Sequence, residues 1–164
     1  GEYIAFLDSD DTWEDAKLEN QLKFMQINNF NISHTSYQIM DNKNNKIKKR
    51  IARSFNNVNE LLKSCDIGLS TVMIKRNIFL DDCFFPETKT KEDFILWLKI
   101  LKKDHKIGGL DQVLMNWRKL ENSLSSSTIQ KLRDGFNVYY KHMNFSFLKS
   151  IYYLFCLSIN YLKK

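Results

Sequence analysis

The pattern of apolar and polar positions predicts that the chain opens with a buried strand. Residues 3–7 are apolar without interruption, which is typical of a strand buried on both faces in a parallel or mixed sheet. Three acids, Asp8, Asp10 and Asp11, follow this run. Side chains two positions apart point the same way in an extended chain, so we expect the carboxylates of Asp8 and Asp10 to converge.

A helix is predicted after this acidic turn. Leu18, Leu22 and Met25 recur at helical spacing and form a single apolar stripe. Thr12 and Asp15 have the spacing of a capping box in front of it. We therefore expect a helix whose buried face consists of those three apolar side chains.

Extended and helical patterns alternate along the rest of the chain. They predict extended segments at 32–40, 46–53, 70–74 and 113–118, a short helix at 59–65, a loop at 81–91, and a strong helix between Thr90 and Gly108-Gly109. Thr90 and Asp93 form a second capping pattern at the start of the strong helix, whose expected buried stripe is Phe94, Trp97, Leu98 and Leu101. A serine-rich link at 123–128 precedes residues 129–162, which are expected to be helical. This order predicts an α/β fold with a mixed sheet, flanking helices and a C-terminal helical tail.

Composition and charge narrow the class of protein. The chain has 164 residues, of which 43% are hydrophobic and 13% aromatic, and this indicates a globular domain. Residues 43–53 carry six cations and no acid, which we expect to form a solvated hairpin, whereas the first 21 residues carry seven acids and one lysine. Such separated charges argue against general affinity for nucleic acid. The cysteines and histidines are scattered without metal spacing, which argues against a zinc site and indicates reduced thiols in a cytoplasmic protein.

Asp8 and Asp10 are candidate ligands for a hard divalent cation. Ions of the magnesium type take one or two protein carboxylates and complete their shell with substrate phosphates and water. The alternative interpretation is an acidic loop that turns the chain and caps the next helix.

Three motifs in order resemble glycosyltransferase family 2, whose members have the GT-A fold. They are Tyr3–Trp13 with Lys17-Leu18-Glu19, then Phe84–Glu87 leading into Lys91–Phe94 and Leu96–Leu98, then Trp117-Arg118 with Asn122–Ser125. The resemblance covers residues 1–126 and implies the C-terminal half of a Rossmann-like GT-A domain, without the N-terminal half that binds the nucleotide. Residues 127–164 would then be a helical extension.

The resemblance implies an inverting, metal-dependent glycosyltransferase of bacterial surface polysaccharide synthesis. Such an enzyme moves a sugar from a nucleotide-sugar donor to a glycan or a lipid-linked acceptor. By resemblance, Asp8 and Asp10 would bind Mn²⁺ or Mg²⁺, with Asp10 the direct ligand and Asp11 in support. Arg118 would contact the donor diphosphate, for which a guanidinium is suited; a surface ion pair with Glu121 is its alternative. A non-catalytic remnant or binding module is the alternative for the whole chain.

The same resemblance assigns the catalytic base to the Glu92-Asp93 pair. The acceptor hydroxyl must lose its proton as it attacks, which requires a positioned carboxylate. Asp93 would be that base, and Glu92 would orient the acceptor or a water molecule. A plain capping role is the alternative for Asp93, because the helix dipole favours a carboxylate in the first turn.

The C-terminal tail carries a separate expectation. Residues 145–164 are rich in aromatic and aliphatic side chains but are interrupted by polar ones, which argues against a membrane span. Aromatic helices with basic ends suit the bilayer interface, so peripheral contact with the inner face of the cell membrane is one interpretation. Packing against the missing half of the fold is the other.

Overall fold

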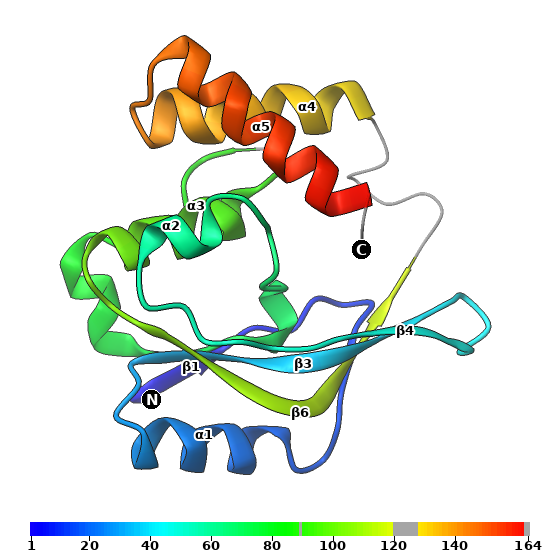
Figure 1. Cartoon of the computed structure of the whole chain (residues 1–164). Coiled ribbons are helices and arrows are strands. Elements are labelled where there is room, and N and C mark those ends of the chain that lie inside the picture. The colour runs from blue at the N-terminus through cyan, green and yellow to red at the C-terminus, as the bar shows by residue number, and fades with distance from the viewer. Residues whose placement is uncertain (89, 120–127, 163–164) are drawn as a thin grey trace.

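A mixed sheet forms the centre of the computed structural model, which describes residues 1–88, 90–119 and 128–162 (Figure 1). Its strands are β1 (Tyr3–Ala5), β2 (Thr12–Trp13), β3 (Ile32–Met40), β4 (Lys46–Arg50), β5 (Met73–Lys75) and β6 (Ile107–Arg118). They are ordered β1-β5-β3-β6-β2, and β4 pairs with β3 beside this path. β3 and β6 run parallel, and the other pairs are antiparallel. The predicted α/β fold with a mixed sheet is confirmed.

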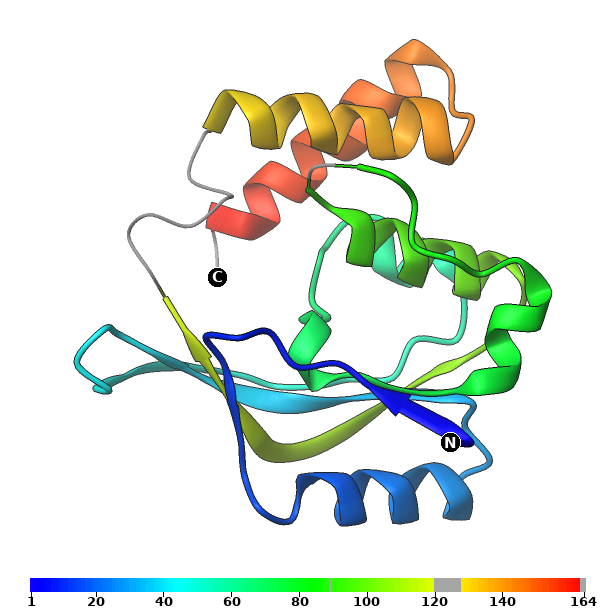
Figure 2. The ribbon, with the colours of Figure 1, turned by 180° about the vertical axis from the view of Figure 1, so that it is seen from behind.

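Helices cover both faces of the sheet (Figures 1 and 2). On one face lies α1 (Lys17–Ile27), and on the other lie α2 (Val58–Leu61) and α3 (Glu92–Lys102). Short 3₁₀ helices span Leu69–Thr71 and Arg76–Asp81. Above α3, a further layer contains α4 (Thr128–Asn137), a π-helical turn (Val138–His142) and α5 (Phe147–Leu162). The tail is therefore helical as predicted, but the predicted domain boundary at 126/127 and the serine-rich link before residue 128 lie outside the described residues.

The strong central helix was predicted correctly in its type and its core. Phe94, Trp97, Leu98 and Leu101 of α3 are all buried, and their neighbours Ile95, Leu96 and Ile100 are buried as well. A helix that is apolar on every side belongs between two layers, and α3 lies between the sheet and the α4–α5 layer (Figure 1).

The first helix differs from its prediction, because its buried face is largely polar. Of the predicted stripe only Met25 is fully buried, and Leu18 is 45% exposed. Lys17 and Gln21 are buried instead, and the Lys17 ammonium donates to Gln21 Oε1 at 2.8 Å. The Gln21 amide in turn donates to the carbonyl and the hydroxyl of Ser33. The sheet face beneath α1 therefore presents hydrogen-bond acceptors that a leucine would leave unpaired.

Both predicted capping patterns are wrong. Thr12 lies in β2, where it pairs with Asn116 of β6, so α1 begins several residues later. Thr90 donates its hydroxyl hydrogen to Asp134 of α4 at 2.6 Å. The N-cap of α3 is instead Lys91, whose φ of 69° is left-handed. Neither threonine caps its helix, because each one pairs with a residue of another element.

The opening strand is also less buried than predicted. β1 is half-buried, and within the described residues it pairs only with β5, so it forms an edge of the sheet. The expectation of a strand buried on both faces is therefore wrong, since all three residues of β1 are only partly buried.

Gly108 and Gly109 do not end the central helix, as the sequence predicted, but lie inside β6. A Cβ atom on Gly109 would meet the backbone carbonyl carbon of Arg53 at 2.3 Å. The segment around Arg53 is held there because Phe55 and Ile107 exchange backbone hydrogen bonds. Glycine at position 109 thus allows two backbone segments to touch.

Gly109→Ala is expected to lower the free energy of unfolding by about 1–3 kcal/mol, because backbone must move to admit the methyl group. Urea denaturation measures this change. Gly68→Ala is the matched control, since its Cβ would meet no heavy atom closer than 3.9 Å. Equal urea midpoints for the two variants would show that the backbone around Gly109 admits a methyl group without loss of stability.

Candidate active site

The candidate site lies beyond the carboxyl ends of three strands that run in the same direction. β1 and β3 are both antiparallel to β5, and β3 is parallel to β6. The carboxyl ends of β1, β3 and β6 therefore lie at the same end of the sheet. In open α/β sheets, ligands bind outside the carboxyl ends of the strands. The acidic turn follows β1, and Arg118 is the last residue of β6.

Ser70 holds the acidic turn in place. The turn is closed by a hydrogen bond from the Asp11 amide to the Asp8 carbonyl at 3.1 Å. The Asp8 amide donates to the Ser70 hydroxyl at 3.0 Å, and Trp13 Nε1 donates to the Ser70 carbonyl at 2.7 Å. Ser70 is buried in the 3₁₀ helix before β5. One serine thus anchors both sides of the turn to the sheet.

The carboxylates of the turn repel one another. The pKa of Asp8 is raised, first because the surrounding protein displaces water and next because Asp10 is negatively charged. Burial also raises the pKa of Asp11, and a hydrogen bond from the Ser70 hydroxyl partly offsets that rise. Asp11 Oδ1 accepts a hydrogen bond from the Arg118 amide at 3.2 Å, which ties the turn to the end of β6.

These donors fit a divalent cation that also binds a phosphorylated substrate. A cation between Asp8 and Asp10 would relieve their repulsion, and carboxylate oxygens are the ligands that hard ions prefer. In the part of the chain that the structure describes, no three His, Cys, Asp or Glu side chains cluster as a full ligand set. The ion would therefore complete its shell with phosphate oxygens and water.

The second carboxylate pair, Glu92 and Asp93, opens α3. Burial raises the pKa of Asp93 to about 6, and repulsion from Glu92 and from Asp8 adds to the rise. Asp93 Oδ1 also accepts a hydrogen bond from the Phe94 amide at 2.6 Å, within the first turn of α3, although Asp93 is not the N-cap of that helix. The left-handed backbone at Lys91 bends the chain just before the pair. Strain of this kind concentrates at functional sites.

The structure brings the two acidic groups into electrostatic reach of each other. The charge of Asp8 contributes to the pKa of Asp93, although the two residues are far apart in the sequence. Aromatic contacts bridge their segments, because the Phe6 ring lies 5.5 Å from that of Phe85, which lies 6.4 Å from Trp97. The acidic turn and the start of α3 therefore lie close enough to form one candidate site.

Sequence reasoning missed two residues of this site. One is Ser70, and the other is Tyr37 of β3, whose pKa is raised to about 12, mainly by burial, with repulsion from Asp11 and Asp93 as smaller causes. The Tyr37 hydroxyl is therefore neutral at physiological pH. No local signal marked Tyr37, since the residues of β3 do not alternate between apolar and polar side chains.

Arg118 is joined to the site through its backbone, as described, and it lies half-buried at the end of β6. Its alternative partner, Glu121, lies outside the described residues. The assignment of the Arg118 guanidinium to the donor diphosphate therefore stays a prediction.

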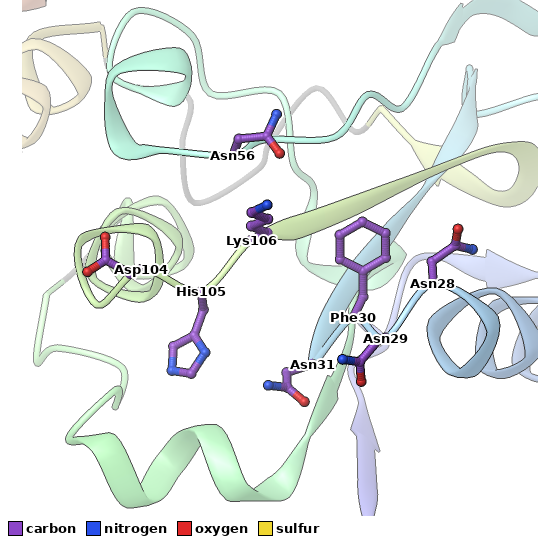
Figure 3. Close-up of a pocket in the computed structure, with 8 residues that line it drawn as sticks. All are labelled: Asn28, Asn29, Phe30, Asn31, Asn56, Asp104, His105 and Lys106. Carbon is purple, nitrogen blue, oxygen red and sulfur yellow. The ribbon is translucent and has the colours of Figure 1, made fainter.

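A separate hollow, drawn in Figure 3, lies near the starts of β3 and β6. It has a volume of about 480 Å³ and is lined by several amide side chains, among them Asn28, Asn31 and Asn56, together with His105. These residues precede β3 and β6 or lie near their starts, so the hollow is separate from the acidic residues.

Comparison with known proteins places the chain in a family. Residues 1–81 match the model of glycosyl transferase family 2. TuaG of Bacillus subtilis, a glycosyltransferase assigned to teichuronic acid biosynthesis, is 33% identical over 165 residues, which cover 100% of the chain. The chain belongs to glycosyltransferase family 2. It spans only 65% of the length of TuaG.

Two further proteins that resemble this family 2 chain support the assignment. WfgD of Escherichia coli, a UDP-Glc:alpha-D-GlcNAc-diphosphoundecaprenol beta-1,3-glucosyltransferase, is 38% identical over 140 residues, or 84% of the chain and 54% of WfgD. A crystal structure of S. aureus TarS with UDP-GlcNAc superposes with a TM-score of 0.63 at 18% identity. The match covers 94% of the chain and 47% of the crystallised segment 1–349 of TarS, and this likeness shows that the fold is the GT-A type.

Proposed function

We propose that this chain is the metal, acceptor and base half of an inverting glycosyltransferase. The observation that carries the proposal is the chain of ring contacts from Phe6 through Phe85 to Trp97, which joins the segment of the candidate cation site to the helix of the candidate base. The charge of Asp8 also contributes to the raised pKa of Asp93. Family membership supports transfer of a sugar from a nucleotide-sugar donor. A divalent cation, when bound, neutralises the diphosphate that leaves.

Each residue then has a defined task. Asp8 and Asp10 would hold the cation as Mn²⁺ or Mg²⁺, and Asp11 secures their turn against β6. The acceptor hydroxyl oxygen forms a bond to the anomeric carbon while the bond from that carbon to the diphosphate breaks. Asp93 takes the hydroxyl proton as general base, and Glu92 orients the acceptor. One direct displacement inverts the configuration at the anomeric carbon.

The acceptor class is a glycan or a lipid-linked saccharide of the bacterial surface. Support comes from WfgD, whose name contains a diphosphoundecaprenol acceptor, and from TuaG, which is assigned to teichuronic acid. An enzyme with such an acceptor works at the cytoplasmic side of the membrane. Within the described residues, no helix has the length and apolarity needed to cross a bilayer.

The full-length protein tests this proposal in a turnover assay with a panel of nucleotide-sugars and saccharide acceptors. We expect release of nucleoside diphosphate that requires both an acceptor and Mn²⁺, with loss of activity in EDTA and recovery on addition of Mn²⁺. The anomeric configuration of the product, read by NMR, should be opposite to that of the donor. A retained configuration, or full turnover in EDTA, contradicts the proposal.

Ser70→Ala is expected to weaken Mn²⁺ binding about tenfold, because the Asp8 amide loses its hydroxyl acceptor and only the contact of Trp13 with the backbone carbonyl of residue 70 remains. Isothermal titration calorimetry with Mn²⁺ measures this change. Ser70→Thr keeps the hydroxyl and should restore much of the affinity. Ser158→Ala is the control, since that hydroxyl only donates to the Leu154 carbonyl within α5. Unchanged affinity in a folded Ser70→Ala variant would remove the assigned role of Ser70.

A further inference from the structure

The outward face of α5 is apolar although it is exposed. It consists of Leu148, Ile151, Tyr152, Phe155 and Leu162, which recur at helical spacing and whose side chains are 44–83% exposed. Scattered apolar side chains are ordinary on a protein surface, but a whole helix face of them marks a binding surface.

The opposite face of α5 is already used by the chain itself. Ser150 and Leu157 are buried, and the Tyr153 ring stacks on that of Tyr139 at 5.5 Å. Gly135 of α4 permits close packing, because a Cβ there would lie 2.9 Å from Leu154. The helix is thus fixed in place by one face, and the second apolar face has a separate use.

Lysines border the aromatic residues of this helical layer. Lys149 Nζ lies 3.9 Å from the centre of the Phe145 ring. Lys63 Nζ lies 6.0 Å from the centre of the Tyr152 ring, and Lys131 Nζ lies 6.0 Å from that of Tyr161. The sequence from Gly135 to its end contains four lysines and no acid. The charge around the apolar face is therefore positive.

We propose that the outward face of α5 rests on the surface of an anionic lipid bilayer. An apolar helix face among lysines suits the boundary between acyl chains and headgroups, and anionic lipids attract the lysines. The same charge disfavours a second copy of the chain, since a symmetric pairing of two α5 faces would bring the same lysines together. The bilayer is thus the occupant that complements both the apolar character and the charge.

The orientation of α5 links this surface to the candidate site. In both views the C-terminal end of α5 lies on the same side of the molecule as the end of β6 and the β3–β4 hairpin (Figures 1 and 2). The helix that carries the proposed lipid surface therefore ends on the side of the molecule where β6 finishes at Arg118. The proposal stands apart from the transfer reaction, because binding to lipid is measured without turnover.

Sedimentation with vesicles tests the proposal on the full-length protein. We expect it to bind vesicles of phosphatidylglycerol and phosphatidylethanolamine, and to bind phosphatidylcholine vesicles much less. The double variant Leu148→Ser/Phe155→Ser should lower the partition coefficient at least about tenfold. Lys149→Gln should lower it about fivefold on the anionic vesicles alone.

Matched controls come from exposed positions elsewhere. Ile27→Ser, on α1 at the other side of the sheet, and Lys102→Gln, at the end of α3, should leave binding unchanged. These sites are all exposed, so the variants should fold, which circular dichroism checks. Three results would overturn the proposal: no binding to anionic vesicles, equal binding by the double variant, or a dimer in light scattering that the double variant abolishes.

Discussion

Asp93→Asn is expected to reduce turnover of the full-length protein by about 10²–10⁴-fold, which is the usual contribution of a general base. Asparagine keeps the shape of the side chain and can still accept a hydrogen bond from the Phe94 amide. It cannot take a proton. The loss should therefore appear in kcat with little change in donor affinity, as steady-state kinetics would show.

The pH profile provides a second measurement of the same role. The pKa of Asp93 is raised to about 6, so the carboxylate is protonated below that pH and cannot act as a base. We expect kcat/KM to fall as pH drops through 6. A profile that stays flat down to pH 5 would contradict the assignment of Asp93.

The same substitution should stabilise the protein at neutral pH. Between pH 4 and pH 6 the folded protein keeps a proton on Asp93 that the unfolded chain has released, so the free energy of unfolding falls as pH rises through this window. Asp93→Asn removes this cost and is expected to raise the free energy of unfolding at pH 7 by about 3 kcal/mol. Asp104→Asn, at an exposed acid after α3, is the control. A residue kept for capping alone would lose stability instead.

Asp10→Asn is expected to lower Mn²⁺-dependent turnover by about 10²-fold or more, because one of two proposed cation ligands loses its charge. Mn²⁺ affinity, measured by calorimetry, should fall in parallel. Without metal, the substitution should lower the pKa of Asp8, since the Asp10 charge contributes to raising it. Asp15→Asn is the control, because Asp15 is an exposed acid close by in the sequence. Equal metal affinity in the two variants would exclude Asp10 as a ligand.

Hydrophobic spacing was sufficient to predict much of the fold. The residues of the predicted α3 stripe recur at helical spacing, so a helix was the one structure that could bury them together. The β3–β4 hairpin follows from its polar turn, where the Asp41 carboxylate accepts hydrogen bonds from the backbone amides of Lys43 and Asn45. The polar face of α1 was missed because Gln21 is buried for acceptors on the sheet, which no local pattern reveals. The two capping patterns failed for the same reason, since both threonines have tertiary partners.

Some residues of the candidate site could likewise be predicted from the sequence, and others could not. Asp8 and Asp10 are legible because acids directly after an apolar strand stand out. Asp93 is legible only through the family resemblance, since an acid in the first turn of a helix is ordinary. Ser70 is not, because its contact with the acidic turn arises only when β5 pairs with β1. The roles of these residues stay predictions until the variants are measured.

The edge position of β1 bears on how the protein should be handled. Its outer row of amides and carbonyls is open within the described residues, and such a rim is a template for pairing with another molecule. Preparations of this segment in isolation are therefore prone to slow strand-to-strand association, and the short length of β1 limits its rate. Dilute storage and a check by size-exclusion chromatography guard against mistaking such aggregates for a functional oligomer.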